Sequence, residues 1–238
     1  PTMLTRPSAC AHRAGADPRF SLALPILIFY SLLLLSVAEQ PQAAHMLTPI
    51  TLDNAPAVTQ LETLTDHTDG VWTVAFSPNG HLLASCAQDG RVIVRPVDSL
   101  DHTCTLGSYS NWVIGLAFSP DGSQLVNGGT EGFGGSLGPI DIWSVDGDTL
   151  ERSLPGHASG VWSLDYQTST GLLASGSLDA TVRIWNPQSG ELVRQLTGHR
   201  SPVLSVDFNP VQDLLASSST DYTVKLWNPT TGDLLRTL

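Results

Sequence analysis

The chain has 238 residues, of which 41% are hydrophobic, and its formal net charge at pH 7 is −11. This length allows one large domain or two small ones, and the hydrophobic content is ordinary for a globular protein. An acidic surface repels phosphate backbones, so the charge argues against nucleic acid as a partner.

The first predicted element is the apolar segment FSLALPILIFYSLLLLSVA, residues 20–38. Basic residues precede it, and it ends with Ser36 and Ala38, small residues at the positions that a signal peptidase reads. We expect residues 1–38 to be a secretory signal peptide that is cleaved after Ala38, or an uncleaved membrane anchor, because the segment is nearly long enough to cross a bilayer. Translation from Met46 would instead give a cytoplasmic protein.

A linker is expected next, at residues 39–60. At its end, the stretch AVTQLETL, residues 57–64, is typical of a single strand. The folded domain is expected to extend over residues 61–238.

From there to its end the chain contains four copies of one pattern. His67, Tyr109, His157 and His199 are in register, at spacings of 42, 48 and 42 residues. An acidic residue follows each of them 22 positions later, and in the third and fourth copies a tryptophan comes six positions after that acidic residue. Periods of this length predict a repeat architecture. We expect the repeats at about residues 67–108, 109–156, 157–198 and 199–238.

Each repeat contains short runs with strand character. In the third repeat they are VWSLDY, LLASGS, TVRIW and ELVRQL, and the breaks between them are rich in Gly, Pro, Asn and Asp. This pattern predicts an all-β fold made of four-stranded antiparallel sheets. Such a small sheet cannot bury both of its faces, and stacking the sheets radially, as in a β-propeller, solves that problem.

Two Gly-His pairs, each followed by an Asp 22 residues after the His and by a Trp six residues further on, resemble the WD-repeat β-propeller family. The style of the repeat is similar to that of bacterial WD-repeat proteins. The resemblance implies a propeller with four blades present, plus one leading outer strand at residues 57–64. The predicted ring is incomplete, so the chain looks like a fragment of a propeller.

In the WD-repeat family the matching His, Ser, Asp and Trp form a structural tetrad inside each blade. The resemblance implies two full tetrads and one partial tetrad: His157, Ser175, Asp179 and Trp185; His199, Ser217, Asp221 and Trp227; and His67, Ser85 and Asp89, with Arg95 in place of the Trp. The second repeat has Tyr109, Asn127 and Glu131 instead of the His, Ser and Asp.

A serine hydrolase uses the same residue types, but it needs a single constellation with an oxyanion hole, and nothing requires that constellation to recur every 42 residues. A repeated fold unit does require recurrence. We therefore expect no catalytic residue, no cofactor and no metal.

Three tryptophans, Trp72, Trp112 and Trp162, fall at or just before the innermost strands. They are candidates for binding a partner around the central channel, although packing between blades would explain them equally well. The predicted function is a non-enzymatic scaffold, exported or membrane-tethered, that binds a protein or peptide and touches a membrane only through its N-terminal segment. The alternative is a secreted propeller enzyme, or a binder of a small ligand or cation in the channel, where Asp165 and Asp207 are the acidic candidates.

Overall fold

The computed structural model describes residues 60–129 and 138–238, and within these ranges the chain forms sixteen strands and no helix. The strands are β1 (Val71–Phe76), β2 (Leu82–Ala87), β3 (Arg91–Pro96), β4 (Cys104–Ser108), β5 (Val113–Phe118), β6 (Gln124–Gly129), β7 (Ile140–Ser144), β8 (Thr149–Leu154), β9 (Val161–Tyr166), β10 (Leu173–Ser177), β11 (Thr181–Asn186), β12 (Glu191–Thr197), β13 (Val203–Phe208), β14 (Leu215–Ser219), β15 (Val224–Trp227) and β16 (Leu234–Thr237). The predicted all-β fold is confirmed.

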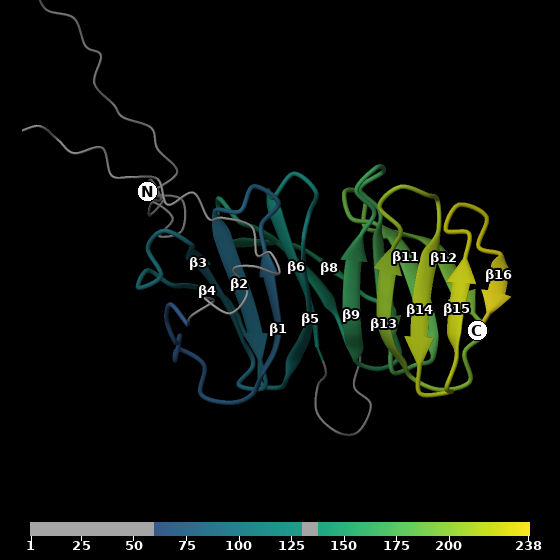
Figure 1. Cartoon of the computed structure of the whole chain (residues 1–238), viewed down its shortest axis with the longest axis horizontal. Helices are drawn as coiled ribbons and strands as arrows, with labels where there is room; N and C mark the ends of the chain where they lie inside the picture. Colours follow the sequence, from purple (N-terminus) through teal and green to yellow (C-terminus); the bar gives the residue numbers. More distant parts are fainter. Residues whose placement is uncertain (1–59, 130–137) are drawn as a thin grey trace, which may run out of the picture. The chain divides into compact units, whose positions relative to one another are not determined.

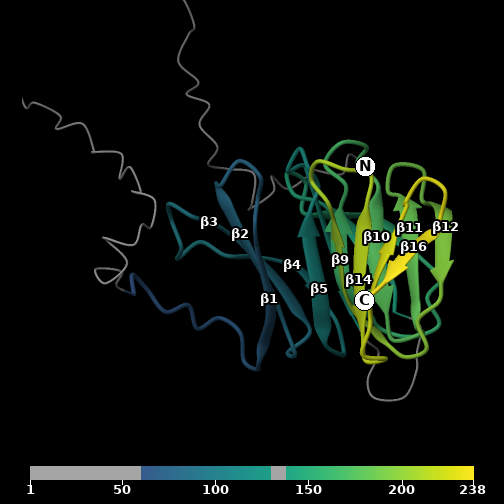
Figure 2. The same ribbon diagram turned by 45° about the vertical axis from the view of Figure 1, so that its right-hand side comes forward.

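Consecutive strands form four antiparallel sheets of four strands each, and we call these sheets blades 1 to 4. The first strand of each blade contacts the first strand of the next one, and Figures 1 and 2 show β1, β5 and β9 following one another in this way. The first strands are therefore the innermost strands of a propeller. Four blades are present and the ring is open, as the sequence predicts.

Turn chemistry explains why the strands end where they do. After β1, the amide of Gly80 donates a hydrogen bond to the carbonyl of Ser77, and Gly80 has a φ of 74°. Gly122 repeats this arrangement after β5, with a φ of 75°. A residue with a side chain is disfavoured at such values, so the glycine of the S-P-N-G and S-P-D-G sequences allows the chain to reverse.

The hydrophobic core lies between the blades. One cluster joins blades 1 and 2, a second joins blades 2 and 3, and a third joins blades 3 and 4. The third cluster includes Val203 and Phe208 from the innermost strand of blade 4 together with Ala174 of blade 3. Each blade thus covers the face that its neighbour cannot bury alone.

The outward face of blade 1 has no such neighbour among the described residues. Val74 and Phe76 of β1 are 62% and 63% exposed, whereas the equivalent Val206 and Phe208 of β13 are each 4% exposed. The open ring therefore leaves an apolar blade face in contact with solvent.

The predicted leading outer strand differs from the structure. Residues 60–64 are not in a strand, and residues 57–59 lie outside the described ranges. The expected strand would belong to a further blade, because each described sheet already has its own outer strand, namely β4, β8, β12 or β16. No other strand of such a blade is among the described residues, so residues 60–64 have no strand to pair with. The apolar segment at residues 20–38 and residues 39–59 of the linker also lie outside the described ranges. The part of the chain that is described has no helix long and apolar enough to cross a bilayer.

Candidate functional site

The four predicted tetrad residues of blade 3 lie together and are joined by hydrogen bonds. His157 is 2.8 Å from Asp179 through Nδ1 and Oδ2, and 2.7 Å from Ser175 through Nε2 and Oγ. The indole N–H of Trp185 donates to the same serine oxygen at 2.8 Å. This series of hydrogen bonds, from Asp through His and Ser to Trp, connects the turn before β9 to strands β10 and β11 and to the turn between them.

Blade 4 has the same arrangement. His199 is 2.8 Å from Asp221 through Nδ1 and 2.8 Å from Ser217 through Nε2. Trp227 donates to Ser217 at 2.8 Å. In both blades the neighbouring serines, Ser177 and Ser219, bond elsewhere, each donating to a backbone carbonyl.

The charges in the blade 3 tetrad are fixed by its surroundings. Burial acts to raise the pKa of Asp179, but bonds from His157, Thr181 and the amide of Ala158 outweigh it and hold the pKa far below its usual value. Burial lowers the pKa of His157, more than the neighbouring carboxylate raises it. At neutral pH the pair is therefore an ionised aspartate and a neutral imidazole that donates its Nδ1 hydrogen.

This geometry holds a blade together and does not suit nucleophilic catalysis. Ser175 is completely buried, and its oxygen is bonded to both His157 and Trp185. A substrate cannot reach a hydroxyl in that position, and a nucleophile must be accessible to attack. The recurrence of the same bonds in blade 4 is what a structural unit requires.

Blade 1 has three members of the tetrad. His67 Nε2 is 2.9 Å from Ser85 Oγ, and its Nδ1 is 3.1 Å from Asp89. Arg95, at the tryptophan position, is buried and forms an ion pair with Asp66 at 2.9 Å. An ion pair thus replaces the indole at the outer side of this blade.

Blade 2 has a different set of bonds that the sequence did not reveal. The hydroxyl of Tyr109 donates to Asp141 at 2.7 Å, and Trp143 donates to the amide oxygen of Asn127 at 2.8 Å. The acid comes from β7, whereas Glu131, the expected position, lies outside the described residues. Asp141 occupies the register position that holds Arg183 in blade 3, so only its unusual charge at that position could have signalled its role.

The three predicted partner-binding tryptophans form a cluster, which we call the tryptophan cluster. The ring centroids of Trp72 and Trp112 are 5.7 Å apart, and those of Trp72 and Trp162 are 6.5 Å apart. Trp72 is 46% exposed, and the other two are partly buried. The buried indole N–H of Trp162 has no hydrogen-bond partner in the described part of the chain.

A repeated backbone irregularity positions two of these side chains. The pairing of each innermost strand with the next strand shifts by one residue near its start, which leaves Trp72 in β1 and Trp162 in β9 at a bulge. A bulge turns the side chain at that point out of the regular alternation of a strand. Three blades therefore contribute indoles to one end of the innermost strands.

The acidic residues of the innermost strands have a structural role in blade 3. Asp165 accepts a hydrogen bond from the amide of Phe208 at 2.6 Å, and Ser163 accepts one from the amide of Val206 at 3.1 Å. Burial, with a contribution from the charge of Asp207, raises the pKa of Asp165. No group of three or more His, Cys, Asp or Glu side chains in the described ranges is placed to hold a metal ion.

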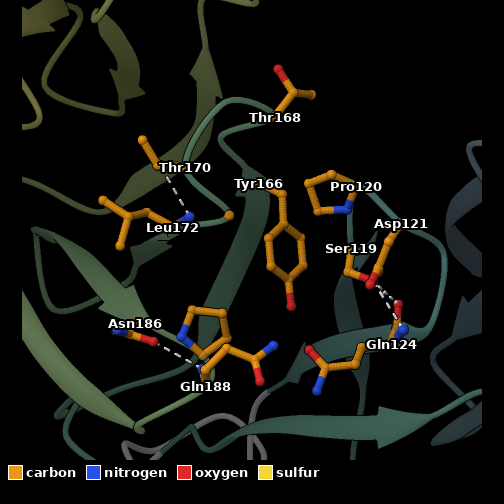
Figure 3. Close-up of a pocket in the computed structure, with 12 residues that line it drawn as sticks. Ser119, Pro120, Asp121, Gln124, Tyr166, Thr168, Thr170, Leu172, Asn186 and Gln188 are labelled. Carbon is orange, nitrogen blue, oxygen red and sulfur yellow. Dashed lines mark hydrogen bonds between the residues drawn. The ribbon is translucent and has the colours of Figure 1, made fainter.

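A second concave site lies between blades 2 and 3 (Figure 3). It has a volume of about 370 Å³ and is formed by the turn from Ser119 to Gln124 in blade 2, the loop from Thr168 to Leu172 in blade 3, and the segment from Asn186 to Gln188. The ring of Tyr166 stands between these segments. We call this site the interblade pocket.

Known proteins share the repeat. The family WD40 (WD domain, G-beta repeat) matches residues 58–94, 148–186 and 190–228. Most of blade 2 falls outside the matches, as its altered tetrad would lead one to expect.

Three similar proteins illustrate the relationship. Protein hir-1 of Neurospora crassa is 32% identical over 145 residues, which cover 52% of this chain and 13% of that protein. WD repeat-containing protein SL1-17 of Schistosoma mansoni is 32% identical over 138 residues, 56% of this chain and 44% of that protein. WD repeat-containing protein 26 homolog of Arabidopsis thaliana is 32% identical over 115 residues, 47% of this chain and 18% of that protein. The chain thus spans less than half the length of each of these relatives.

The matched repeats, the four blades and the shared hydrogen-bonded tetrads agree with one another. The chain belongs to the WD-repeat family of β-propeller proteins.

Proposed function

We propose that this chain is a scaffold that binds a protein or peptide through the tryptophan cluster. WD-repeat proteins serve as scaffolds for protein interactions, and the buried tetrads account for the His, Ser and Asp residues without chemistry. The observation that supports the proposed binding surface is the meeting of three indoles from three blades, one of them half exposed. Tryptophan is enriched among the residues that dominate binding energy, because it buries a large rigid area and keeps one N–H donor.

The unpartnered N–H of Trp162 adds a polar contact to this surface. A backbone carbonyl of a bound peptide would accept it and remove the cost of an unsatisfied buried donor. The cluster therefore favours an extended segment that places an apolar side chain on Trp72 and a carbonyl near Trp162.

A peptide-display library panned against the 238-residue chain tests this proposal. Peptides selected by the wild type should lose at least tenfold in affinity for a Trp72→Ala variant, since a buried tryptophan contact is worth more than the 1.4 kcal/mol that a factor of ten requires. Tyr222→Ala is the matched control, because Tyr222 is an aromatic residue that is 98% exposed and lies outside the cluster. Equal binding by wild type and Trp72→Ala would show that the partner docks elsewhere.

We also propose that the protein is exported or tethered to the outer face of a membrane. The support is the sequence alone: an apolar run at residues 20–38 that follows basic residues and ends in a small-residue exit. Mass spectrometry of the protein purified from cells tests it. A mature chain that begins at Glu39 indicates a cleaved signal, an intact segment in the membrane fraction indicates an anchor, and a soluble chain beginning at Met46 would contradict export.

A further inference from the structure

We propose that the interblade pocket binds the guanidinium group of an arginine side chain from a partner protein. The pocket is separate from the tryptophan cluster, because Trp162 and Tyr166 lie near opposite ends of β9, about 13 Å apart at the usual rise of a strand. Its volume of about 370 Å³ is within the range of ligand-binding pockets. The inference therefore does not depend on the binding surface proposed above.

An unpartnered hydroxyl lies at the centre of this pocket. Tyr166 is only 6% exposed, and its hydroxyl has no hydrogen-bond partner among the described residues. In Figure 3 the hydroxyl ends between Gln124 of blade 2 and Gln188 of blade 3. A buried hydroxyl without a partner is costly, which makes a polar ligand at this point favourable.

Comparison with the other blades shows that this hydroxyl is an addition. The last residue of each innermost strand is Phe76, Phe118, Tyr166 or Phe208. Phe118 and Phe208 fill the same position as buried rings. The fold thus accepts phenylalanine here, and the oxygen of Tyr166 is not needed for packing.

Several groups around the hydroxyl can accept hydrogen bonds from a ligand. Gln124 uses its side-chain N–H to donate to Glu151 at 2.5 Å, which leaves its carbonyl oxygen as an acceptor. Ser119 and Thr170 likewise use their hydroxyl hydrogens, which they donate to Asp121 and Gln167. Acceptor oxygens of Gln124 and Ser119 in blade 2 and of Thr170 in blade 3 therefore remain for a ligand.

The pocket is also negatively charged. Bonds from the hydroxyl of Ser119 and from Ser123 lower the pKa of Asp121, so its carboxylate is ionised at neutral pH. Burial raises the pKa of Tyr166, and the charges of Asp121 and Glu151 raise it further. A guanidinium carries a positive charge and five N–H donors in one plane, so it can bond to acceptors on both blades at once.

A guanidinium of the chain already lies at one edge of the pocket. Arg152 donates to the backbone carbonyl of Gln188 at 3.2 Å. The side chain of Arg152 is exposed. The bond shows that a backbone carbonyl at this edge can accept from a guanidinium.

A titration followed by NMR tests the proposal with N-acetyl-arginine-N-methylamide as the probe and its citrulline analogue as the neutral match. The arginine probe should cause saturable shifts of the amides of Gly122 and Gly171, and the citrulline probe should not. Tyr166→Phe and Asp121→Asn should each weaken the arginine probe about tenfold, the usual effect of one hydrogen bond to a charged group. Tyr222→Phe, at a fully exposed tyrosine, should leave binding unchanged, and so should Trp72→Ala.

Thermal melts followed by circular dichroism check that both pocket variants are folded. Tyr166→Phe keeps a ring that this position accepts, as Phe118 and Phe208 show in the other blades. Asp121→Asn keeps an acceptor oxygen. Equal binding of the citrulline probe would overturn the proposal, as would unchanged affinity in both pocket variants or the absence of saturable binding by the wild type. A failure of this kind leaves the tryptophan cluster untouched, because its test uses different variants and different ligands.

Discussion

The bond between Asp179 and His157 is the residue-scale feature most open to test. Replacing Asp179 by Ala removes the acceptor of the His157 Nδ1 hydrogen and of the Ala158 amide. We expect the free energy of unfolding to fall by about 1–3 kcal/mol, the cost of leaving such buried groups unsatisfied. Urea denaturation followed by tryptophan fluorescence measures it. Asp146→Ala, at an exposed position, is the control and should change stability by less than about 0.5 kcal/mol.

The same pair predicts how stability depends on pH. Since the folded pKa of His157 lies below its ordinary value of 6.5, the unfolded chain takes up a proton first as the pH falls. The contribution of His157 is therefore complete above pH 6.5 and declines below it. Asp179 has a folded pKa below its ordinary value of 3.8, so its contribution is complete above that value and is lost as the pH falls further.

Urea midpoints measured from pH 8 to pH 3 should thus decrease in two stages, the first beginning near pH 6.5. A His157→Gln variant should be less stable at pH 8 and should lose part of the first stage. A midpoint that stays constant between pH 7 and pH 5 would contradict a buried neutral imidazole.

At the scale of the element, the blades should differ in local stability at their outer strands. In blade 3, the buried indole of Trp185 lies on β11, between β10 and β12. In blade 1, Arg95 takes the place of this tryptophan and forms an ion pair with Asp66, whose side chain is 38% exposed. An ion pair open to water contributes little, and a buried indole contributes a large apolar area. Hydrogen exchange read by mass spectrometry should therefore be faster in β4 than in β12. Equal rates in the two strands would mean that the ion pair compensates for the lost indole.

The predictability of these elements from sequence follows from their repetition. Alignment in steps of 22 and 6 residues placed His157, Asp179 and Trp185 in one blade, because hydrogen-bonded partners within a blade recur at fixed spacings. The same alignment missed Asp141, since blade 2 draws its acid from another strand. It also missed the interblade pocket, because that pocket is formed by turns of two different blades. The spacing of residues within one repeat does not show which turns of neighbouring blades lie close together.

Tyr166 illustrates most clearly the limit of prediction from the sequence. In the alignment it is a conservative change from the phenylalanines of the other innermost strands. Only the structure shows that the added hydroxyl lies between two blades without a hydrogen-bond partner among the described residues. The polar residues that blade 2 places around this hydroxyl determine what it can bind.

At the scale of the whole molecule, the two open blade faces are complementary. Blade 3 binds blade 4 through Ser163 and Asp165, which accept bonds from the amides of β13. Blade 4 has Ser205 and Asp207 at the same register positions, and both are exposed. The other open face belongs to blade 1. Val74 and Phe76 of β1 pair with β2 in the same register in which Val206 and Phe208 of β13 pair with β14. The backbone amides of Val74 and Phe76 therefore point away from β2, toward the free edge of β1.

We therefore expect the 238-residue chain to associate head to tail, with blade 4 of one copy covering blade 1 of a second copy. Such a contact would bury the apolar face of β1 and is heterologous, so it can close into a ring of two copies or extend further. Analytical ultracentrifugation over a range of concentrations should show the association. Phe76→Ser should weaken it by removing the apolar contact, and Asp207→Ala should weaken it from the opposite face by removing the acceptor. Val211→Ser, at a side chain 89% exposed in a loop of blade 4, should have no effect. A chain that stays monomeric at every concentration, or association that neither variant changes, would show that the open faces do not recognise each other.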